Sequence, residues 1–224
     1  MKPRIFHLLI ACSLLAGPLP AQDPLRFEDQ IQEFRDKDMQ HPTPANAILF
    51  VGSSSIRGWN GMAEAFPDFD VINRGFGGSH FSDAIYWFDD LFFSHQPAAI
   101  FIYEGDNDLN SGKSTAQVLA DAQSLIQRIK TTHPSVPIGL ISPKPSIARW
   151  NLKETYEATN AALKALAETD SDLFFVDVWF PSLGSDGKPK PETFREDELH
   201  MNEKGYVIWQ RAILDTLRAM KLLD

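Results

Sequence analysis

Three side chains, one near the start and two near the end of the sequence, have the types needed to activate a hydroxyl group. The first is one of the serines Ser53, Ser54 and Ser55 in GSSSIRGW, directly after a short apolar run, and Asp197 and His200 stand three residues apart in EDELHMNEKGY. A carboxylate at that spacing can bind one ring nitrogen of the histidine and leave the other nitrogen free to accept a proton. These residues predict a serine nucleophile with a histidine base that an aspartate orients.

Acyl transfer also needs hydrogen-bond donors for the negative oxygen that develops on the substrate. The glycine-rich NRGFGGSH contains Gly75, Gly77 and Gly78, and EGDNDL contains Asn107. A glycine amide and the NH₂ group of an asparagine can both serve as such donors. Asp106 and Asp108 could instead hold a hard cation, but the spacing of a calcium loop with its distal Glu is absent. The segments together predict a complete acyl-transfer site that uses no metal and no organic cofactor.

The elements that carry these segments alternate between strand and helix patterns. Five short apolar runs without polar alternation are expected to form strands buried on both faces: 47–52, 69–73, 98–105, 136–142 and 173–179. Helical patterns follow at 82–93, 114–133, 151–168 and 202–220, with Ser114 and Gln117 spaced as a capping box. The alternation predicts an α/β/α sandwich with a parallel sheet and right-handed crossovers. In such folds, sites lie beyond the carboxyl ends of the strands, where all the candidate segments stand.

The order GSSS, NRGFGG, GDND and DELHMNEKGY resembles the SGNH-hydrolase superfamily, also called the GDSL esterases and lipases. The resemblance covers the chain from its first expected strand to its last expected helix, and the first block is similar to a bacterial branch with G-S-S-S-I-R. It implies a five-stranded parallel sheet of flavodoxin-like order. It also implies Ser54, Asp197 and His200 as catalytic residues and an oxyanion hole made by Ser54, Gly78 and Asn107.

One position departs from the family pattern. Ser53 stands where the family's first block has an aspartate, which removes a charge beside the nucleophile but no catalytic group. The change leaves Ser53 and Ser55 as alternative nucleophiles. A helix-capping serine is the non-catalytic alternative for this motif.

The segments 143–151 and 180–196 are the only long loops expected around the site. With so little chain available to cover it, we expect an open site that suits small acyl groups. Trp59, Trp150 and Trp179 could stack on a sugar ring, with core packing as the alternative for Trp59 and Trp179. Lys144 and Arg149 could bind an anionic substrate group, with solvated surface charge as the alternative.

The sequence therefore predicts a serine esterase for short-chain esters, above all acetyl esters, with small-molecule or saccharide substrates. The alternative activities are a lysophospholipase or a thioesterase that uses the same groups. A carbohydrate-binding module without catalysis is the non-enzymatic alternative.

The first 21 residues have the layout of a secretory signal peptide, with a basic start, an apolar run of about a dozen residues and a small residue, Ala21, at the expected cleavage site. We expect export to the periplasm or the medium and a single mature domain over 22–224. The competing interpretation is a lipoprotein anchored at Cys12, the only cysteine. No other apolar run is long enough to span a bilayer.

The overall charge excludes one class of partner. The formal charge is −9, and removal of Lys2 and Arg4 with the signal would bring it to −11. A chain this acidic lacks the basic surface that grips a phosphate backbone, so nucleic acid is not an expected partner.

Overall fold

The computed structural model of the chain describes residues 23–223. The predicted signal peptide over 1–21 and Cys12 lie outside the described residues, so the signal, the anchor and export stay predictions.

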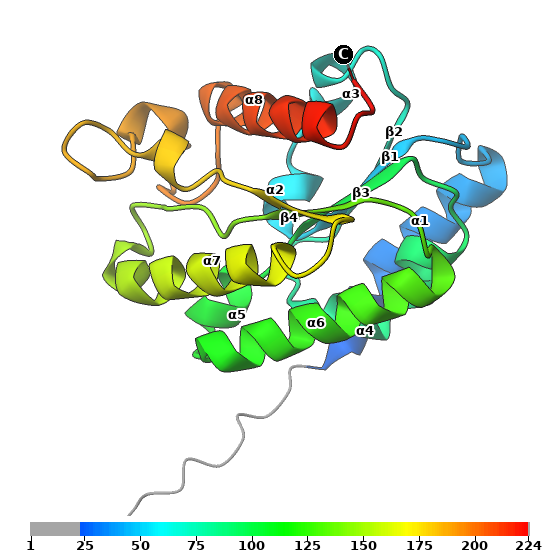
Figure 1. The fold of residues 1–224 in the computed structure, drawn as a ribbon, viewed down its shortest axis with the longest axis horizontal. Coiled ribbons are helices and arrows are strands. Elements are labelled where there is room, and N and C mark those ends of the chain that lie inside the picture. The colour runs from blue at the N-terminus through cyan, green and yellow to red at the C-terminus, as the bar shows by residue number, and fades with distance from the viewer. Residues whose placement is uncertain (1–22, 224) are drawn as a thin grey trace, which may run out of the picture.

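A five-stranded parallel sheet forms the centre of the molecule, with strand order β2-β1-β3-β4-β5 (Figure 1). The strands are β1 (Ile48–Gly52), β2 (Val71–Gly75), β3 (Ala99–Tyr103), β4 (Ile138–Ile141) and β5 (Leu173–Val176). Every residue of β1, β3 and β4 is buried, as expected for strands covered on both faces. The predicted fold class and strand order are confirmed.

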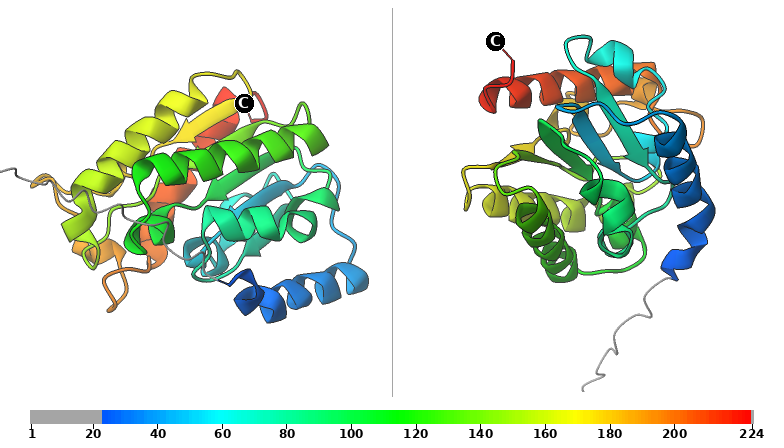
Figure 2. Two further views of the ribbon diagram at one scale, coloured as in Figure 1. Left: turned by 90° about the horizontal axis from the view of Figure 1, so that it is seen from below. Right: turned by 90° about the vertical axis from the view of Figure 1, so that its right-hand side faces the viewer.

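Helices cover both faces of the sheet and create two separate hydrophobic cores (Figures 1 and 2). One face carries α1 (Glu28–Gln40), α4 (Phe81–Tyr86), α6 (Thr115–Thr132) and α7 (Lys153–Ala167). The other carries α2 (Ser54–Arg57), α3 (Met62–Ala65) and α8 (Glu203–Ala219). The remaining short helices are η1 (Pro24–Phe27), η2 (Asp89–Phe93), α5 (Asp106–Asn110), η3 (Trp150–Leu152), η4 (Phe180–Ser182) and η5 (Pro191–Thr193).

The two long helices beside the functional segments begin at strong caps. Ser114 and Gln117 form the predicted capping box at the start of α6. The side chain of Asn202 accepts hydrogen bonds from the amides of Lys204 and Gly205 and so starts α8. Because Asn202 also donates to the carbonyl of Phe194, at 2.9 Å, this cap ties the helix to the loop that precedes it.

Two elements differ from the sequence-based expectation. The helix predicted over 82–93 is divided into α4 and the π-helical turn η2. Trp87, between the two, donates from its indole to the carbonyl of Pro24, at 3.0 Å, and Phe88 and Phe92 stack on each other with ring centroids 5.0 Å apart. Helix α1 was not predicted at all, although Ile31 and Phe34 are buried in the larger core. Within residues 23–223, no helix is both long and apolar enough to cross a membrane.

Candidate active site

Ser54 begins α2 directly after the first strand. A side chain at Gly52, where φ is +155°, would put its Cβ 2.3 Å from the carbonyl oxygen of Tyr103, so only glycine permits this tight exit from β1. The neighbouring Ser53 and Ser55 are buried, whereas Ser54 is half-buried. Ser53 occupies the N-cap position but makes no capping bond with its side chain. Of the three serines, Ser54 is therefore the one that reaches the surface at the carboxyl edge of the sheet.

The Ser54 hydroxyl lies within hydrogen-bond distance of His200. The distance from Ser54 Oγ to His200 Nε2 is 3.0 Å, and that from His200 Nδ1 to Asp197 Oδ2 is 2.6 Å. The carboxylate fixes Nδ1 as the protonated ring nitrogen, which leaves Nε2 able to accept the serine proton. The arrangement can activate a hydroxyl group for attack on a carbonyl carbon.

A tight turn holds Asp197 against His200. The second carboxylate oxygen, Oδ1, accepts from the amides of Leu199 and His200, at 3.0 and 2.8 Å. Glu198, the residue after Asp197, adopts a left-handed backbone conformation with φ +56°. Burial raises the pKa of Asp197, but the hydrogen bonds from the His200 ring and from the two amides outweigh it and bring the pKa to about 2. Asp197 is therefore ionised over the whole physiological range.

The donors expected for an oxyanion lie at the ends of the two strands that flank β1. Gly78 follows β2 with φ +89°, and its amide has no acceptor among residues 23–223. Asn107 lies on α5 after β3, and its Nδ2 donates to the carbonyl of Ser79, at 3.0 Å. That bond uses one hydrogen of the NH₂ group and leaves the second one available. The adjacent Gly77 amide instead donates to Oε1 of Gln30 on α1, at 3.2 Å.

Lys144 and Arg149 both bind Asp106. The Lys144 ammonium lies 3.0 Å from Asp106 Oδ2, and the Arg149 guanidinium lies 2.6 Å from Oδ1. Lys144 is 2% exposed, so the alternative reading of solvated surface charge is wrong for Lys144, and the ion pair makes it wrong for Arg149. The sequence could not show this pairing, because the loop after β4 meets the end of β3 only in the folded chain. Their contact with a substrate stays a prediction.

The tryptophans near the strand ends are mainly packing residues. Trp59 is buried and stacks on Tyr206, with ring centroids 5.0 Å apart. Trp179 is buried and stacks on Trp150, at 5.9 Å. Trp150 is half-buried and borders a hollow of about 720 Å³ together with Lys190 and Glu198. Trp59 also borders the hollows at the start of α8 and beside α1, so contact of any of these rings with a ligand stays a prediction.

Sequence reasoning missed Glu104, which is fully buried behind the glycine-rich turn. Its Oε1 accepts from the hydroxyl of Ser79, at 2.6 Å, while Oε2 has no partner among the described residues. Burial first, and then the nearby Asp108, raise the pKa of Glu104 well above its ordinary value, so the carboxyl group is neutral. The sequence did contain a signal for a buried Glu104, because this residue stands directly before Gly105 at the end of a run expected to form a buried strand.

Arg57 is a second residue that the motif analysis passed over. The side chain is exposed and has no hydrogen bond or ion pair within residues 23–223. It lies across Gly77: a Cβ built there would be 3.5 Å from a guanidinium nitrogen of Arg57 and 3.9 Å from Cβ of Ser54. A cation therefore borders the same glycine as the serine does.

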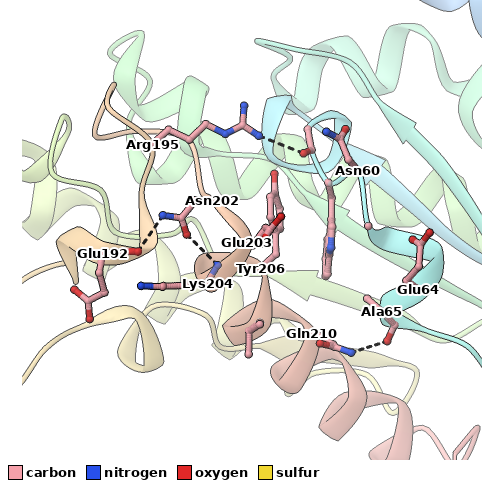
Figure 3. A pocket seen from close by; sticks show the side chains of 14 residues that line it. Asn60, Glu64, Ala65, Glu192, Arg195, Asn202, Glu203, Lys204, Tyr206 and Gln210 are labelled. Atoms are coloured by element: carbon pink, nitrogen blue, oxygen red, sulfur yellow. Dashed lines mark hydrogen bonds between the residues drawn. The ribbon is translucent and has the colours of Figure 1, made fainter.

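The larger hollows do not include Ser54 or His200. One of about 750 Å³ is formed by the loop after α2 and by the start of α8, and Asn60, Glu64, Arg195 and Tyr206 line it (Figure 3). In Figure 3 the Arg195 side chain reaches toward the loop that carries Asn60, and its guanidinium is 3.5 Å from the carbonyl of Gly58. Neither Ser54 nor His200 lines this hollow or the one that Trp150 borders.

The acidic residues at the end of β3 already have cationic partners. Asp106 binds Lys144 and Arg149, and Asp108 binds Lys113, at 2.8 Å. Across residues 23–223, no group of three or more His, Cys, Asp or Glu side chains is arranged to hold a metal ion.

Comparisons with known proteins agree with this architecture. In sequence, residues 49–208 match the model of the GDSL-like Lipase/Acylhydrolase family. No protein with a curated description matches significantly.

Among solved structures, a protein from Streptococcus pneumonia provisionally described as a platelet activating factor is 24% identical, with a TM-score of 0.77 over 86% of this chain and 94% of that one. A GDSL-like lipase from Bacteroides thetaiotaomicron is 20% identical, with a TM-score of 0.72 over 86% and 98%. A carbohydrate esterase family 3 protein from Talaromyces cellulolyticus is 15% identical, with a TM-score of 0.60 over 79% and 98%. These TM-scores establish a shared fold, and the family match spans most of the chain. The chain therefore belongs to the GDSL-like lipase/acylhydrolase family.

Proposed function

We propose that the protein is a serine esterase that hydrolyses short-chain esters, above all acetyl esters, including those on carbohydrates. The observation that carries the proposal is the continuous hydrogen-bonded chain from Ser54 Oγ through the His200 ring to Asp197. Two donors, the Gly78 amide and the Asn107 side chain, follow the neighbouring strands at the same edge of the sheet.

In the proposed reaction, Ser54 Oγ attacks the ester carbonyl carbon while His200 Nε2 takes the hydroxyl proton. The carbonyl oxygen becomes negative and is stabilised by the amides of Ser54 and Gly78 and by Nδ2 of Asn107. Protonated His200 then gives its proton to the leaving alcohol, which yields an acyl-enzyme. A water molecule activated by His200 releases the acid and restores Ser54.

The preference for small acyl groups is supported by how open the site is. The side chains of Asp197 and His200 are 48% and 33% exposed, although they form the proposed charge pair. The two hollows described above, of about 750 and 720 Å³, do not include Ser54, so neither offers a long acyl chain a pocket that starts at the proposed nucleophile. The fold shared with a carbohydrate esterase is compatible with a sugar ester as substrate.

The proposal is tested with p-nitrophenyl acetate and p-nitrophenyl octanoate, together with a fluorophosphonate label. Ser54→Ala should lower kcat/KM for the acetate by about a thousandfold or more and abolish labelling, because no other group can form the acyl-enzyme. The matched controls, Ser53→Ala and Ser55→Ala, should remain labelled.

Three outcomes would contradict the proposal in different ways. Labelling that survives in Ser54→Ala would remove the nucleophile assignment. A wild-type protein that takes no label would favour the binding module. A preference for the octanoate ester would favour a lysophospholipase or thioesterase over an acetylesterase.

A further inference from the structure

An asparagine can stabilise an oxyanion only with the NH₂ end of its amide. The two ends of the group have nearly the same shape, and a reversed amide would present a carbonyl oxygen to the developing negative charge. In the structure, Oδ1 of Asn107 accepts from Nη2 of Arg149, at 3.1 Å, while Nδ2 donates to the carbonyl of Ser79, at 3.0 Å. Both contacts favour the same orientation of the amide.

We propose that Arg149 is a positioning residue that fixes the Asn107 amide with its NH₂ group toward the reacting ester. The inference rests on the proposed esterase function. A guanidinium only donates hydrogen bonds, so it can bind Asn107 only through Oδ1. Reversal of the amide would place the NH₂ group of Asn107 against the guanidinium of Arg149, which is donor against donor. It would also place Oδ1 of Asn107 against the carbonyl oxygen of Ser79, which is acceptor against acceptor.

Arg149 can hold Asn107 because Arg149 is itself fixed by Asp106. The Asp106 carboxylate accepts from Arg149, from Lys144 and from the hydroxyls of Tyr103 and Tyr156, at distances between 2.5 and 3.0 Å. These partners come from β3, from the loop after β4 and from α7. Burial raises the pKa of Asp106, but the two cations and the tyrosine hydroxyls outweigh it and hold the pKa well below the ordinary range. The carboxylate is thus a permanent anchor.

The cluster also carries an excess of positive charge next to the proposed oxyanion donor. Lys144 and Arg149 are two cations, and Asp106 is the one carboxylate that binds them. Burial and Asp106 raise the pKa of both Tyr103 and Tyr156, so these hydroxyls stay neutral. Nearby Glu104 is neutral as well, and Lys113 is shared by Asp108 and Asp121, at 2.8 and 2.9 Å, so the excess positive charge belongs to the Asp106 cluster alone. In a buried environment this net charge strengthens the Asn107 amide as a donor to a negative oxygen.

A direct role of Arg149 in substrate binding is less consistent with its surroundings. The side chain is 13% exposed, and its two terminal nitrogens donate to Asp106 and Asn107. A substrate anion would have to compete with a carboxylate that is already in place. We therefore expect Arg149 to affect turnover much more than substrate affinity.

The experiment is a double-mutant cycle with Asn107→Ala, Arg149→Met and the pair, measured as kcat and KM for p-nitrophenyl acetate. Asn107→Ala should lower kcat by roughly a hundredfold or more, because one oxyanion donor is lost. Arg149→Met should lower kcat by at least about tenfold with KM little changed, because small misplacements of a catalytic group cost up to ~100-fold. In the Asn107→Ala background, Arg149→Met should change kcat less than about threefold, since its target is gone.

Tyr156→Phe is the matched control for general damage to the cluster. It removes one partner of Asp106 and one neighbour of Arg149, but it keeps the guanidinium and its contact with Asn107. Its effect should be the same with and without Asn107. Melting temperatures show whether each variant folds, and Arg149→Lys replaces Arg149→Met in the cycle if the latter does not, because one ammonium cannot bridge Asp106 and Asn107 as the planar fork does.

The outcomes separate the positioning role from the esterase proposal. If Asn107→Ala lowers kcat but Arg149→Met does not, or if their effects are additive, the positioning role is wrong while the esterase remains. If Asn107→Ala has no effect on kcat, both the oxyanion assignment of Asn107 and the positioning role are overturned. Of these variants, we expect only Ser54→Ala to lose nearly all activity. That result tests the esterase proposal and says nothing about the role of Arg149.

Discussion

Glu104 is an uncharged acid inside a site that is proposed to stabilise negative charge. It binds the Ser79 hydroxyl, and the Ser79 carbonyl in turn binds Asn107. A carboxylate at this position would oppose an oxyanion, whereas the neutral form leaves the local field to Arg149 and Lys144. Burial of the carboxyl group thus serves the site, but it must cost stability at neutral pH, where an exposed glutamate would ionise.

We predict that Glu104→Gln makes stability less dependent on pH. The folded pKa of Glu104 is raised above its unfolded value, so between these two values the unfolded chain has lost the proton that the native protein keeps. Native stability therefore falls as pH rises above about 4.3, the ordinary glutamate pKa. The glutamine variant does not titrate and should gain melting temperature relative to the wild type between pH 4 and pH 8.

The measurement is the difference in melting temperature between variant and wild type at the two pH values. Glu168→Gln, at an exposed position after α7, serves as the control and should show little change. An equal difference at both pH values for Glu104→Gln would mean that the carboxyl group is not held neutral in the fold.

Single residues were predictable where the partner is close in sequence. The spacing of Asp197 and His200 predicts their contact, which the structure shows at 2.6 Å. The binding of Lys144 to Asp106 was not predictable, because the two are 38 residues apart and meet only when β3 and β4 pair. Short local spacing carries information about contacts, but a lysine in a loop looks the same whether it is solvated or buried.

At the scale of elements, the docking of α2 on the end of β2 positions Ser54. Gly75, the last residue of β2, lies against the backbone of Arg57, the last residue of α2. A Cβ at Gly75 would be 2.1 Å from the amide nitrogen of Arg57 and 2.6 Å from its Cα. No side-chain rotation can relieve a clash with backbone, so the four-residue helix would have to move.

We predict that Gly75→Ala lowers both stability and turnover. The overpacking should cost roughly 1–3 kcal/mol of unfolding free energy, and the displaced helix should lower kcat because Ser54 starts it. Urea unfolding and p-nitrophenyl acetate turnover measure the two effects.

Gly61→Ala is the control, since a Cβ at this N-cap of α3 would meet only one side-chain atom, at 4.0 Å. It should change stability by less than about 0.5 kcal/mol. Unchanged stability in Gly75→Ala would show that α2 can shift without loss.

The strands and long helices were predictable to within a few residues, and the least regular segments were not. The apolar run 47–52 became β1 over Ile48–Gly52, and the pattern at 114–133 became α6 over Thr115–Thr132. Helix α1 was not predicted because its sequence, EDQIQEFRDKDMQ, is mostly polar and buries only Ile31 and Phe34. A pattern with three apolar positions in 13 residues, of which Met39 is exposed, has too little periodicity to predict a helix.

For the whole molecule, η1 and α1 (residues 24–40, called the brace below) lie outside the segment that matches the family but pack against its core. The family match begins at residue 49, yet Phe27, Ile31 and Phe34 are buried in the larger core. Figure 2 shows α1 along the side of the sheet, next to β2 and α4. Gln30 of α1 also binds the amide of Gly77, one residue before the proposed oxyanion donor.

We predict that a variant lacking residues 1–44 is strongly destabilised, while a variant lacking residues 1–22 is not. Each buried side chain contributes about 1.5–3 kcal/mol, so the loss of three should total at least roughly 5 kcal/mol and lower the melting temperature by at least ~10 °C. Differential scanning calorimetry of the two variants tests this. Equal melting temperatures of the two variants would show that the brace does not contribute to the stability of the core.

The order in which the chain is made has a consequence for when the enzyme becomes active. Ser54 follows the first strand and its partner His200 precedes the last helix, 146 residues later. During synthesis, the proposed nucleophile is made before its proposed base. We therefore expect the polypeptide to have no esterase activity until the segment that carries His200 docks, so that completion of folding is itself the activation step.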